Sequence, residues 1–165
     1  LLDGVAVTGG EPLLRRELPA LLRAVKELGY AVKLDTNGSH PEALRAIVAA
    51  GLVDYVAMDI KNSRIRYHET CGAEVLPQIE KSVQLLMNGN IDYEFRTTVC
   101  KPLHTLNDMK DIGIWLKEAK RYFIQQFVDS GNVPDKNLLP FLPEEIKQLK
   151  NAVLPYIPNT CVRGV

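Results

Sequence analysis

The sequence contains few cysteines: Cys71, Cys100 and Cys161 are the only three among 165 residues. They lie far apart, and no two form a CxxC pair or part of a CxxxCxxC motif. This spacing excludes a disulfide framework and a metal site built on clustered cysteines. We therefore expect the three cysteines to be buried and to pack like small apolar residues. The three histidines, at positions 40, 68 and 104, also lack the spacing of metal ligands and are expected in loops.

The chain also lacks an excess of charge and a long apolar run. Twenty basic and twenty acidic residues give a formal net charge of zero, which predicts no general attraction to nucleic acid or membranes. The apolar stretch 18–25 is interrupted by Pro19 and Arg23, so no transmembrane span is predicted. We expect a cytoplasmic protein. There is no initiator Met or signal peptide, and we expect this chain to be part of a longer protein.

Apolar runs alternate with helical periodicities along the chain, without a low-complexity linker or visible repeat. The predicted strands are 5–8, 31–34, 53–61, 93–99 and 123–127. The predicted helices are 13–28, 41–50, 75–87, 107–118 and 143–154, with a loop or short helical turn at 64–72. Residues 129–142 form an irregular connection, and the tail 155–164 is a candidate edge strand. The crossovers are long enough for parallel strand pairing.

Two α/β architectures fit this alternation: an incomplete parallel (β/α) barrel of about five strands with outer helices, or an open, doubly wound sheet. Polar residues follow nearly every strand, and in a barrel these strand ends converge on one face. We therefore prefer the incomplete barrel, as one partial domain over residues 1–165. The first strand would leave an apolar edge, so we expect an upstream segment to pair with it.

The turn Gly9-Gly10-Glu11-Pro12 directly follows the first strand. Two glycines leave the backbone bare, so a ligand can approach its N–H and C=O groups, while Glu11 offers a carboxylate. Pro12 suits the first turn of a helix. These residues could hold a small polar molecule that carries a positive group. The alternative is a plain strand-to-helix connection.

Three further groups of polar residues could bind a ligand. Asp59 and Lys61 are two apart on a strand and share a face, so they could hold an ammonium group or cation and a carboxylate. Asp35 and Asn37 could bind a diol or an amide, and the Arg96 guanidinium could meet a carboxylate. Rim salt bridges and a simple turn remain alternatives. Together these groups outline a pocket for an amino-acid carboxylate, its ammonium group and a ribose.

Four motifs in this order resemble those of radical S-adenosylmethionine (SAM) enzymes: Gly9-Gly10-Glu11-Pro12, Asp35-Thr36-Asn37-Gly38, Asp59-Ile60-Lys61 and Arg96. Their order and spacing are most similar to the glycyl-radical activases, in particular the anaerobic ribonucleotide reductase and pyruvate formate-lyase activating proteins. Residues 67–72, 124–127 and 162–164 add to this resemblance, which covers nearly the whole chain.

The resemblance implies SAM as cofactor, with a [4Fe-4S] cluster in the full-length protein only. Gly9, Gly10 and Glu11 would receive the methionine amino group, and Asp35 would lie near the ribose. Asp59 and Lys61 would lie at the methionyl end, with Asp59 a candidate ligand of a monovalent cation. Arg96 would contact the carboxylate or ribose side of the cofactor.

The resemblance also implies a partner. Asn37 would face the cofactor or a substrate peptide. A flavodoxin or ferredoxin would supply the electron, and reductive cleavage of SAM would give a 5′-deoxyadenosyl radical. This radical takes a hydrogen atom from a glycine of a glycyl-radical enzyme, which is the protein substrate.

The sequence departs from the family because it lacks the CxxxCxxC loop that binds the cluster. We expect truncation to explain this absence, no catalytic residue in the chain itself, and an inactive fragment. Two alternatives remain: an aldolase-type lyase with Lys61 as the Schiff-base lysine, and a non-catalytic binding domain.

Overall fold

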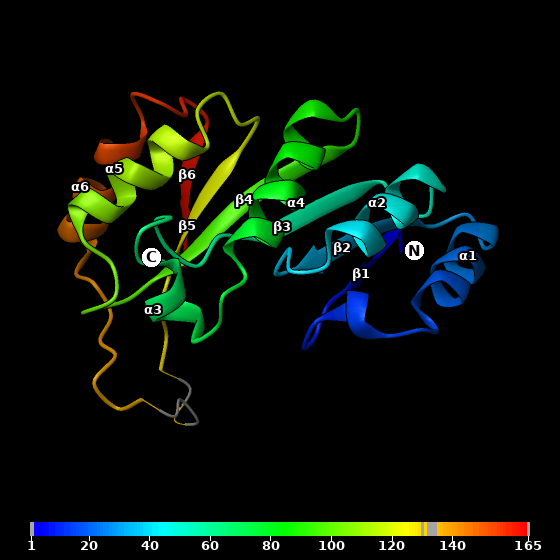
Figure 1. Ribbon diagram of the computed structural model, residues 1–165, viewed down its shortest axis with the longest axis horizontal. Helices are drawn as coiled ribbons and strands as arrows, with labels where there is room; N and C mark the ends of the chain where they lie inside the picture. The colour runs from blue at the N-terminus through cyan, green and yellow to red at the C-terminus, as the bar shows by residue number, and fades with distance from the viewer. Residues whose placement is uncertain (1, 130, 132–134, 165) are drawn as a thin grey trace. The chain divides into compact units, whose positions relative to one another are not determined.

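The computed structural model describes residues 2–129, 131 and 135–164, which form two compact units. The first unit comprises the described residues up to Asp59, together with Val75–Glu94. The second comprises Ile60–Glu74 and the described residues from Phe95 onward. Each unit combines parallel strands with helices, and both are drawn in Figure 1.

The elements of the first unit are β1 (Gly4–Val7), the 3-10 helix η1 (Pro12–Leu14), α1 (Leu18–Glu27), β2 (Ala31–Thr36), α2 (Pro41–Ala49), β3 (Tyr55–Asp59), α4 (Leu76–Asn88) and the first residues of β4 (Asp92–Val99). The elements of the second unit are α3 (Tyr67–Cys71), the rest of β4, α5 (Leu106–Trp115), β5 (Tyr122–Gln126), α6 (Pro143–Val153) and β6 (Thr160–Arg163).

In the first unit β2 lies between β1 and β3, and all three strands are parallel. One face of β2 is apolar and buried, with Val32 and Leu34 almost inaccessible, and α1 packs against this strand. The neighbouring strand β3 contributes Val56 and Met58 to the same buried face. Successive strand residues point to opposite faces, so the alternation in β2 assigns the helices to one side of the sheet.

The other face of the same strands is polar. Lys33 pairs in register with Tyr55, and Asp35 with Ala57, so their side chains share this face. Asp59 follows two residues after Ala57 and lies on it too. The first unit therefore carries the predicted Asp35 and Asp59 on the face opposite α1.

In the second unit β4, β5 and β6 are parallel neighbours in that order. Helices α5 and α6 pack against each other, and α6 also contacts β5 and β6 (Figure 1). The fully buried side chains include Phe95, Tyr122 and Ile124 from the strands and Ile112 from α5. This apolar layer fixes β4, which carries Arg96, against β5.

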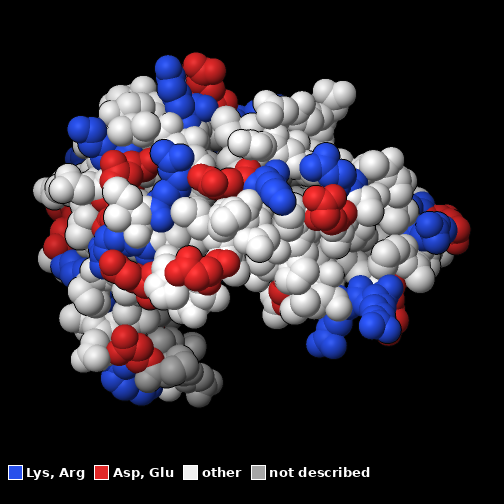
Figure 2. All heavy atoms as spheres, in the orientation of Figure 1, with Lys and Arg blue, Asp and Glu red and all other residues white. Residues whose placement is uncertain are grey.

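The predicted fold class is confirmed, with six parallel strands in place of about five because the tail forms β6. Among the described residues β1 pairs only with β2, and β6 only with β5, so the sheet does not close, as expected for an incomplete barrel. Figure 2 shows acidic and basic side chains interspersed over the face in view, as expected for balanced charge. Within the described ranges, no helix has both the length and the apolar character that crossing a membrane requires.

Several predicted element bounds were wrong. The second strand continues to Thr36, so Asp35 and Thr36 belong to β2 and not to the turn after it. The first helix begins at Leu18 instead of residue 13, because Arg15 adopts an extended conformation after the short η1 turn. The third strand spans Tyr55–Asp59, so Lys61 lies beyond it. Helix α5 ends at Trp115, short of residue 118. In the predicted irregular connection 129–142, residues 130 and 132–134 lie outside the described residues.

Candidate functional site

The backbone of the Gly9-Gly10 turn has a conformation that favours glycine. Both residues have positive φ angles, 95° and 54°, in the region that L side chains rarely adopt. A Cβ added at either position would meet no described atom within 4 Å. The backbone conformation of the turn therefore requires glycine at both positions. The space beside the turn is open, so a ligand could approach the backbone closely.

The Glu11 side chain joins this turn to the turn that follows β2. Its Oε1 accepts hydrogen bonds from the Thr36 hydroxyl at 2.8 Å and the Leu13 N–H at 3.2 Å. Its Oε2 accepts the Asn37 N–H at 2.7 Å. The Glu11 residue is only 9% exposed. A carboxylate offers about four acceptor positions, so three are used by the protein and roughly one is left for a ligand.

The turn after β2 is ordered by its own side chains as well. Thr36 Oγ1 accepts the Gly38 N–H at 3.0 Å, and Asn37 Oδ1 accepts the Ser39 N–H at 2.9 Å. Gly38 has a φ of 75°, and a Cβ there would collide with the Met58 side chain. The Gly38 carbonyl accepts the buried Ser82 hydroxyl from α4 at 2.7 Å. This turn is thus fixed against both β3 and α4.

The predicted acids Asp35 and Asp59 are half-buried on the polar face of the first unit. Lys33 Nζ lies 2.9 Å from Asp35 Oδ1 and forms an ion pair with it. On the same face, the Tyr55 hydroxyl donates to the buried Glu94 carboxylate at 2.9 Å. Asp35 and Asp59 therefore belong to a polar surface in which opposite charges and hydroxyl groups already interact.

Lys61 and Arg96 belong to the second unit and are both half-buried. The Arg96 carbonyl accepts the Ile60 N–H at 2.8 Å, which joins β4 to the segment before Lys61. Arg96 pairs in register with Phe123 on β5, and the Arg163 guanidinium lies over the Phe123 ring at 3.3 Å from its centroid. The structure thus brings Glu11 and Asn37 into contact within one unit and connects Lys61 with Arg96 through the backbone of the other.

The cysteines of the second unit do not fit an iron–sulfur cluster. Cys71 is half-buried, Cys100 is buried and Cys161 is exposed. Burial raises the pKa of the Cys71 and Cys100 thiols, which disfavours the thiolate that ligation requires. Within the part of the chain that the structure describes, no three His, Cys, Asp or Glu residues are grouped to hold a metal ion.

Sequence reasoning missed three residues that organise the candidate site. Thr36 was interpreted only as part of a motif, yet its hydroxyl bonds to Glu11. His104 was expected in a loop with no role, but it is 4% exposed and contacts the Lys61 carbonyl. Tyr67 lies on the short helix α3, and its hydroxyl contacts the Lys61 N–H. Two of these contacts join residues that are distant in sequence, and no local pattern indicates them.

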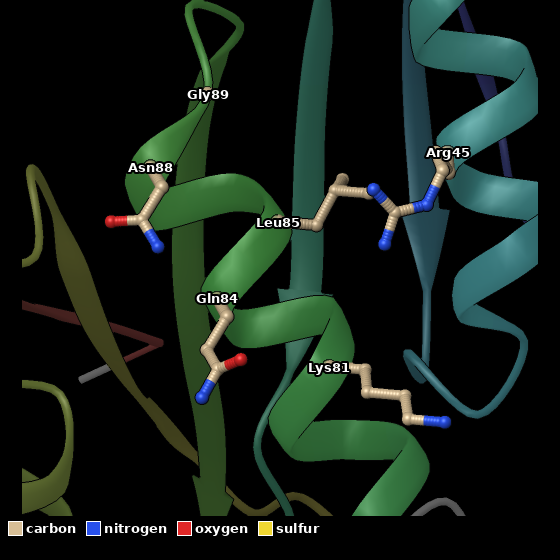
Figure 3. A pocket seen from close by; sticks show the side chains of 6 residues that line it. All are labelled: Arg45, Lys81, Gln84, Leu85, Asn88 and Gly89. Carbon is tan, nitrogen blue, oxygen red and sulfur yellow. The ribbon is translucent and has the colours of Figure 1, made fainter.

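A separate hollow of about 410 Å³ lies between α2 and α4. Figure 3 shows Arg45 reaching from α2 toward α4, and Lys81 pointing from α4 toward α2. The residues lining this hollow are Arg45, Lys81, Gln84, Leu85, Asn88 and Gly89. None of them is a predicted site residue, so the hollow on the helix layer is distinct from the strand-end turns.

Comparison with known proteins gives relatives over the length of the chain. A family model described as the radical SAM superfamily matches residues 2–116. A Methanocaldococcus jannaschii protein provisionally named a glycyl-radical enzyme activating enzyme is 33% identical over 171 residues, covering 99% of this chain and 71% of that protein. The 7-carboxy-7-deazaguanine synthase of Thermococcus kodakarensis is 37% identical over 86 residues, 52% of this chain and 33% of the enzyme.

Solved structures share the fold. A domain of pyruvate-formate lyase-activating enzyme from Bacteroides vulgatus superposes with a TM-score of 0.80 at 16% identity, covering 98% of this chain and 99% of that domain. SuiB of Streptococcus suis, bound to S-adenosylmethionine, gives a TM-score of 0.78 at 14% identity over 98% of this chain and 39% of SuiB. At these identities the likeness is one of fold.

Proposed function

Because the chain belongs to the radical SAM superfamily, we propose that it is the SAM-binding part of a glycyl-radical enzyme activating enzyme. The observation that carries the proposal is the Glu11 carboxylate, which links the Gly9-Gly10 turn to the Asn37 turn and keeps about one acceptor position. The family match favours this oxidoreductase-type activity over a Schiff-base lyase.

In the proposed site each polar group of the protein binds a part of SAM with which it can form a hydrogen bond or an ion pair. The backbone at Gly9 and Gly10 and the Glu11 carboxylate receive the methionine ammonium group. Asp35 accepts from the ribose hydroxyls, and Asn37 lies beside the cofactor. When bound and given one electron by the donor, SAM would supply a 5′-deoxyadenosyl radical for hydrogen abstraction and leave methionine.

The proposal also assigns roles to three charged side chains. Lys61 and Arg96 pair with the carboxylate end of the cofactor, and Asp59 lies at the same end and is the candidate ligand of a monovalent cation. The partner in this proposal is a glycyl-radical enzyme of the anaerobic ribonucleotide reductase or pyruvate formate-lyase type, with a flavodoxin or ferredoxin as electron donor and the cytoplasm as location. The three cysteines do not fit the [4Fe-4S] cluster, so its ligands must come from other residues.

The test uses the complete gene product after anaerobic iron–sulfur reconstitution, with dithionite as reductant and 5′-deoxyadenosine as the measured product. We expect SAM cleavage by the wild type and a loss of about tenfold or more in kcat/KM for Lys61→Met. Lys147→Met is the matched control, because Lys147 is exposed on α6 and should keep wild-type activity. A reconstituted protein that leaves SAM intact would refute the proposal.

A further inference from the structure

Lys61 is held at both of its backbone polar groups by side chains. It lies two residues beyond the end of β3, where strand pairing no longer fixes the chain. Its N–H donates to the Tyr67 hydroxyl at 3.3 Å, and its carbonyl lies 2.9 Å from His104 Nε2. Tyr67 is 1% and His104 4% exposed, so both partner side chains are buried, while Lys61 itself is half-buried.

The His104 ring contacts backbone groups through both of its nitrogens. The Lys61 carbonyl can only accept a hydrogen bond, so Nε2 carries the hydrogen. In the neutral ring Nδ1 is then an acceptor for the Cys100 N–H at 3.2 Å, and it lies at the same distance from the Cys100 carbonyl. Burial lowers the pKa of His104, which keeps the ring neutral. The imidazole thus connects the end of β4 to Lys61 in a fixed direction.

A second set of contacts anchors the segment after Lys61 independently of His104. Asn62 Nδ2 donates to the Leu103 carbonyl at 2.9 Å, and the Ser63 hydroxyl donates to Asp108 at 2.9 Å. Arg66 bonds to the same carbonyl at 2.9 Å and to the same carboxylate at 2.8 Å. Removing the imidazole should therefore release the Lys61 peptide while this segment stays attached.

A conservative substitution at Tyr67 tests the position of the same lysine. Its ring packs edge-to-face against Trp115 of α5, with centroids 6.0 Å apart. A Tyr67→Phe substitution keeps this ring contact and removes only the hydroxyl that accepts the Lys61 N–H.

We propose that His104 and Tyr67 are positioning residues, which fix the Lys61 backbone so that the Lys61 ammonium group meets the carboxylate of a bound amino-acid-type cofactor. This inference rests on the proposed function, in which that cofactor is SAM. Neither residue touches the cofactor. Their effect on binding passes through Lys61 alone, and this distinguishes them from residues that merely stabilise the fold.

The test measures equilibrium binding of SAM to the complete gene product by calorimetry, with variants at the three positions. We expect the Kd to rise about 3- to 10-fold in His104→Leu and in Tyr67→Phe, the loss expected for one hydrogen bond that orients the lysine. In His104→Gln an amide N–H can reach the Lys61 carbonyl, so binding should return to within about twofold of wild type.

A double-mutant cycle gives the decisive measurement. In the Lys61→Met background, the His104→Leu and Tyr67→Phe substitutions should cause no further loss of SAM affinity, because the group that they position is gone. Additive losses in that background, or equal losses in His104→Leu and His104→Gln, would overturn the inference. If His104→Leu does not fold, Tyr67→Phe and His104→Gln still decide it.

The same binding measurements distinguish a failure of the proposed function from a failure of the positioning inference. A wild type that does not bind SAM, or a Lys61→Met variant that binds it as tightly as wild type, would remove the role assigned to Lys61. Weakened binding in Lys61→Met with unchanged binding in Tyr67→Phe and His104→Leu would overturn only the inference about positioning.

Discussion

The Glu11→Gln substitution should loosen the connection between the first two strand-end turns without changing the shape of the side chain. The amide oxygen can replace Oε1 and keep the bonds from Leu13 and Thr36. The amide nitrogen then faces the Asn37 N–H, and two donors cannot bond to each other. One hydrogen bond to a charged acceptor is lost and a backbone donor is left unpaired, which costs about 2–3 kcal/mol.

The assay is amide hydrogen exchange of the ligand-free protein. A cost of about 2–3 kcal/mol corresponds to roughly 30- to 150-fold faster exchange of the Asn37 amide if exchange proceeds through local opening. Glu17→Gln is the matched control, because Glu17 is exposed and makes no capping hydrogen bond at the start of α1. An Asn37 amide that exchanges equally slowly in both variants would show that the Glu11 carboxylate does not hold this turn.

Three other variants test the surroundings of the site. Gly38→Ala should lower the free energy of unfolding, measured in urea, by at least about 1 kcal/mol more than Gly29→Ala does. Both glycines have a positive φ, but of the two only Gly38 lies against a side chain, that of Met58. Equal losses in the two variants would contradict this. Asp108→Ala should cost about 3–5 kcal/mol because Ser63 and Arg66 lose their buried acceptor, whereas exposed Asp111→Ala should stay within about 0.5 kcal/mol by the same measurement. The pKa of His104 is lowered in the fold, so the unfolded chain binds more protons and the free energy of unfolding should fall as the pH drops below about 6.5. Urea titrations should show that this free energy depends less on pH in His104→Gln than in the wild type. The same pH dependence in both proteins would refute the role given to His104.

The order of strands and helices could be predicted from the sequence because apolar periodicity is local. The alternation in β2 and the glycine turns after the helices are read within a few residues. The start of α1 could not be predicted in this way. The apolar pattern continues back through Leu14, yet the chain forms a separate 3-10 turn because Glu11 caps it through the Leu13 N–H.

The candidate site could be predicted as a set of residues but not as a set of contacts. The motif around Glu11 indicates a carboxylate beside a bare backbone, and nothing nearby shows that Thr36 and Asn37 each donate a hydrogen bond to it. The contact between His104 and Lys61 spans 43 residues. Such partners are fixed by the topology of the fold, which places the ends of distant strands next to one another.

The apolar face and the polar face of β2 limit which insertions and deletions the strand can accept. Inserting or deleting one residue directly before Val32 would move every later side chain of the strand to the opposite face. Lys33 and Asp35 would then lie under α1, and Val32 and Leu34 would lie on the polar side. A change of two residues would preserve the alternation. Designed insertions or deletions inside this strand should therefore involve an even number of residues.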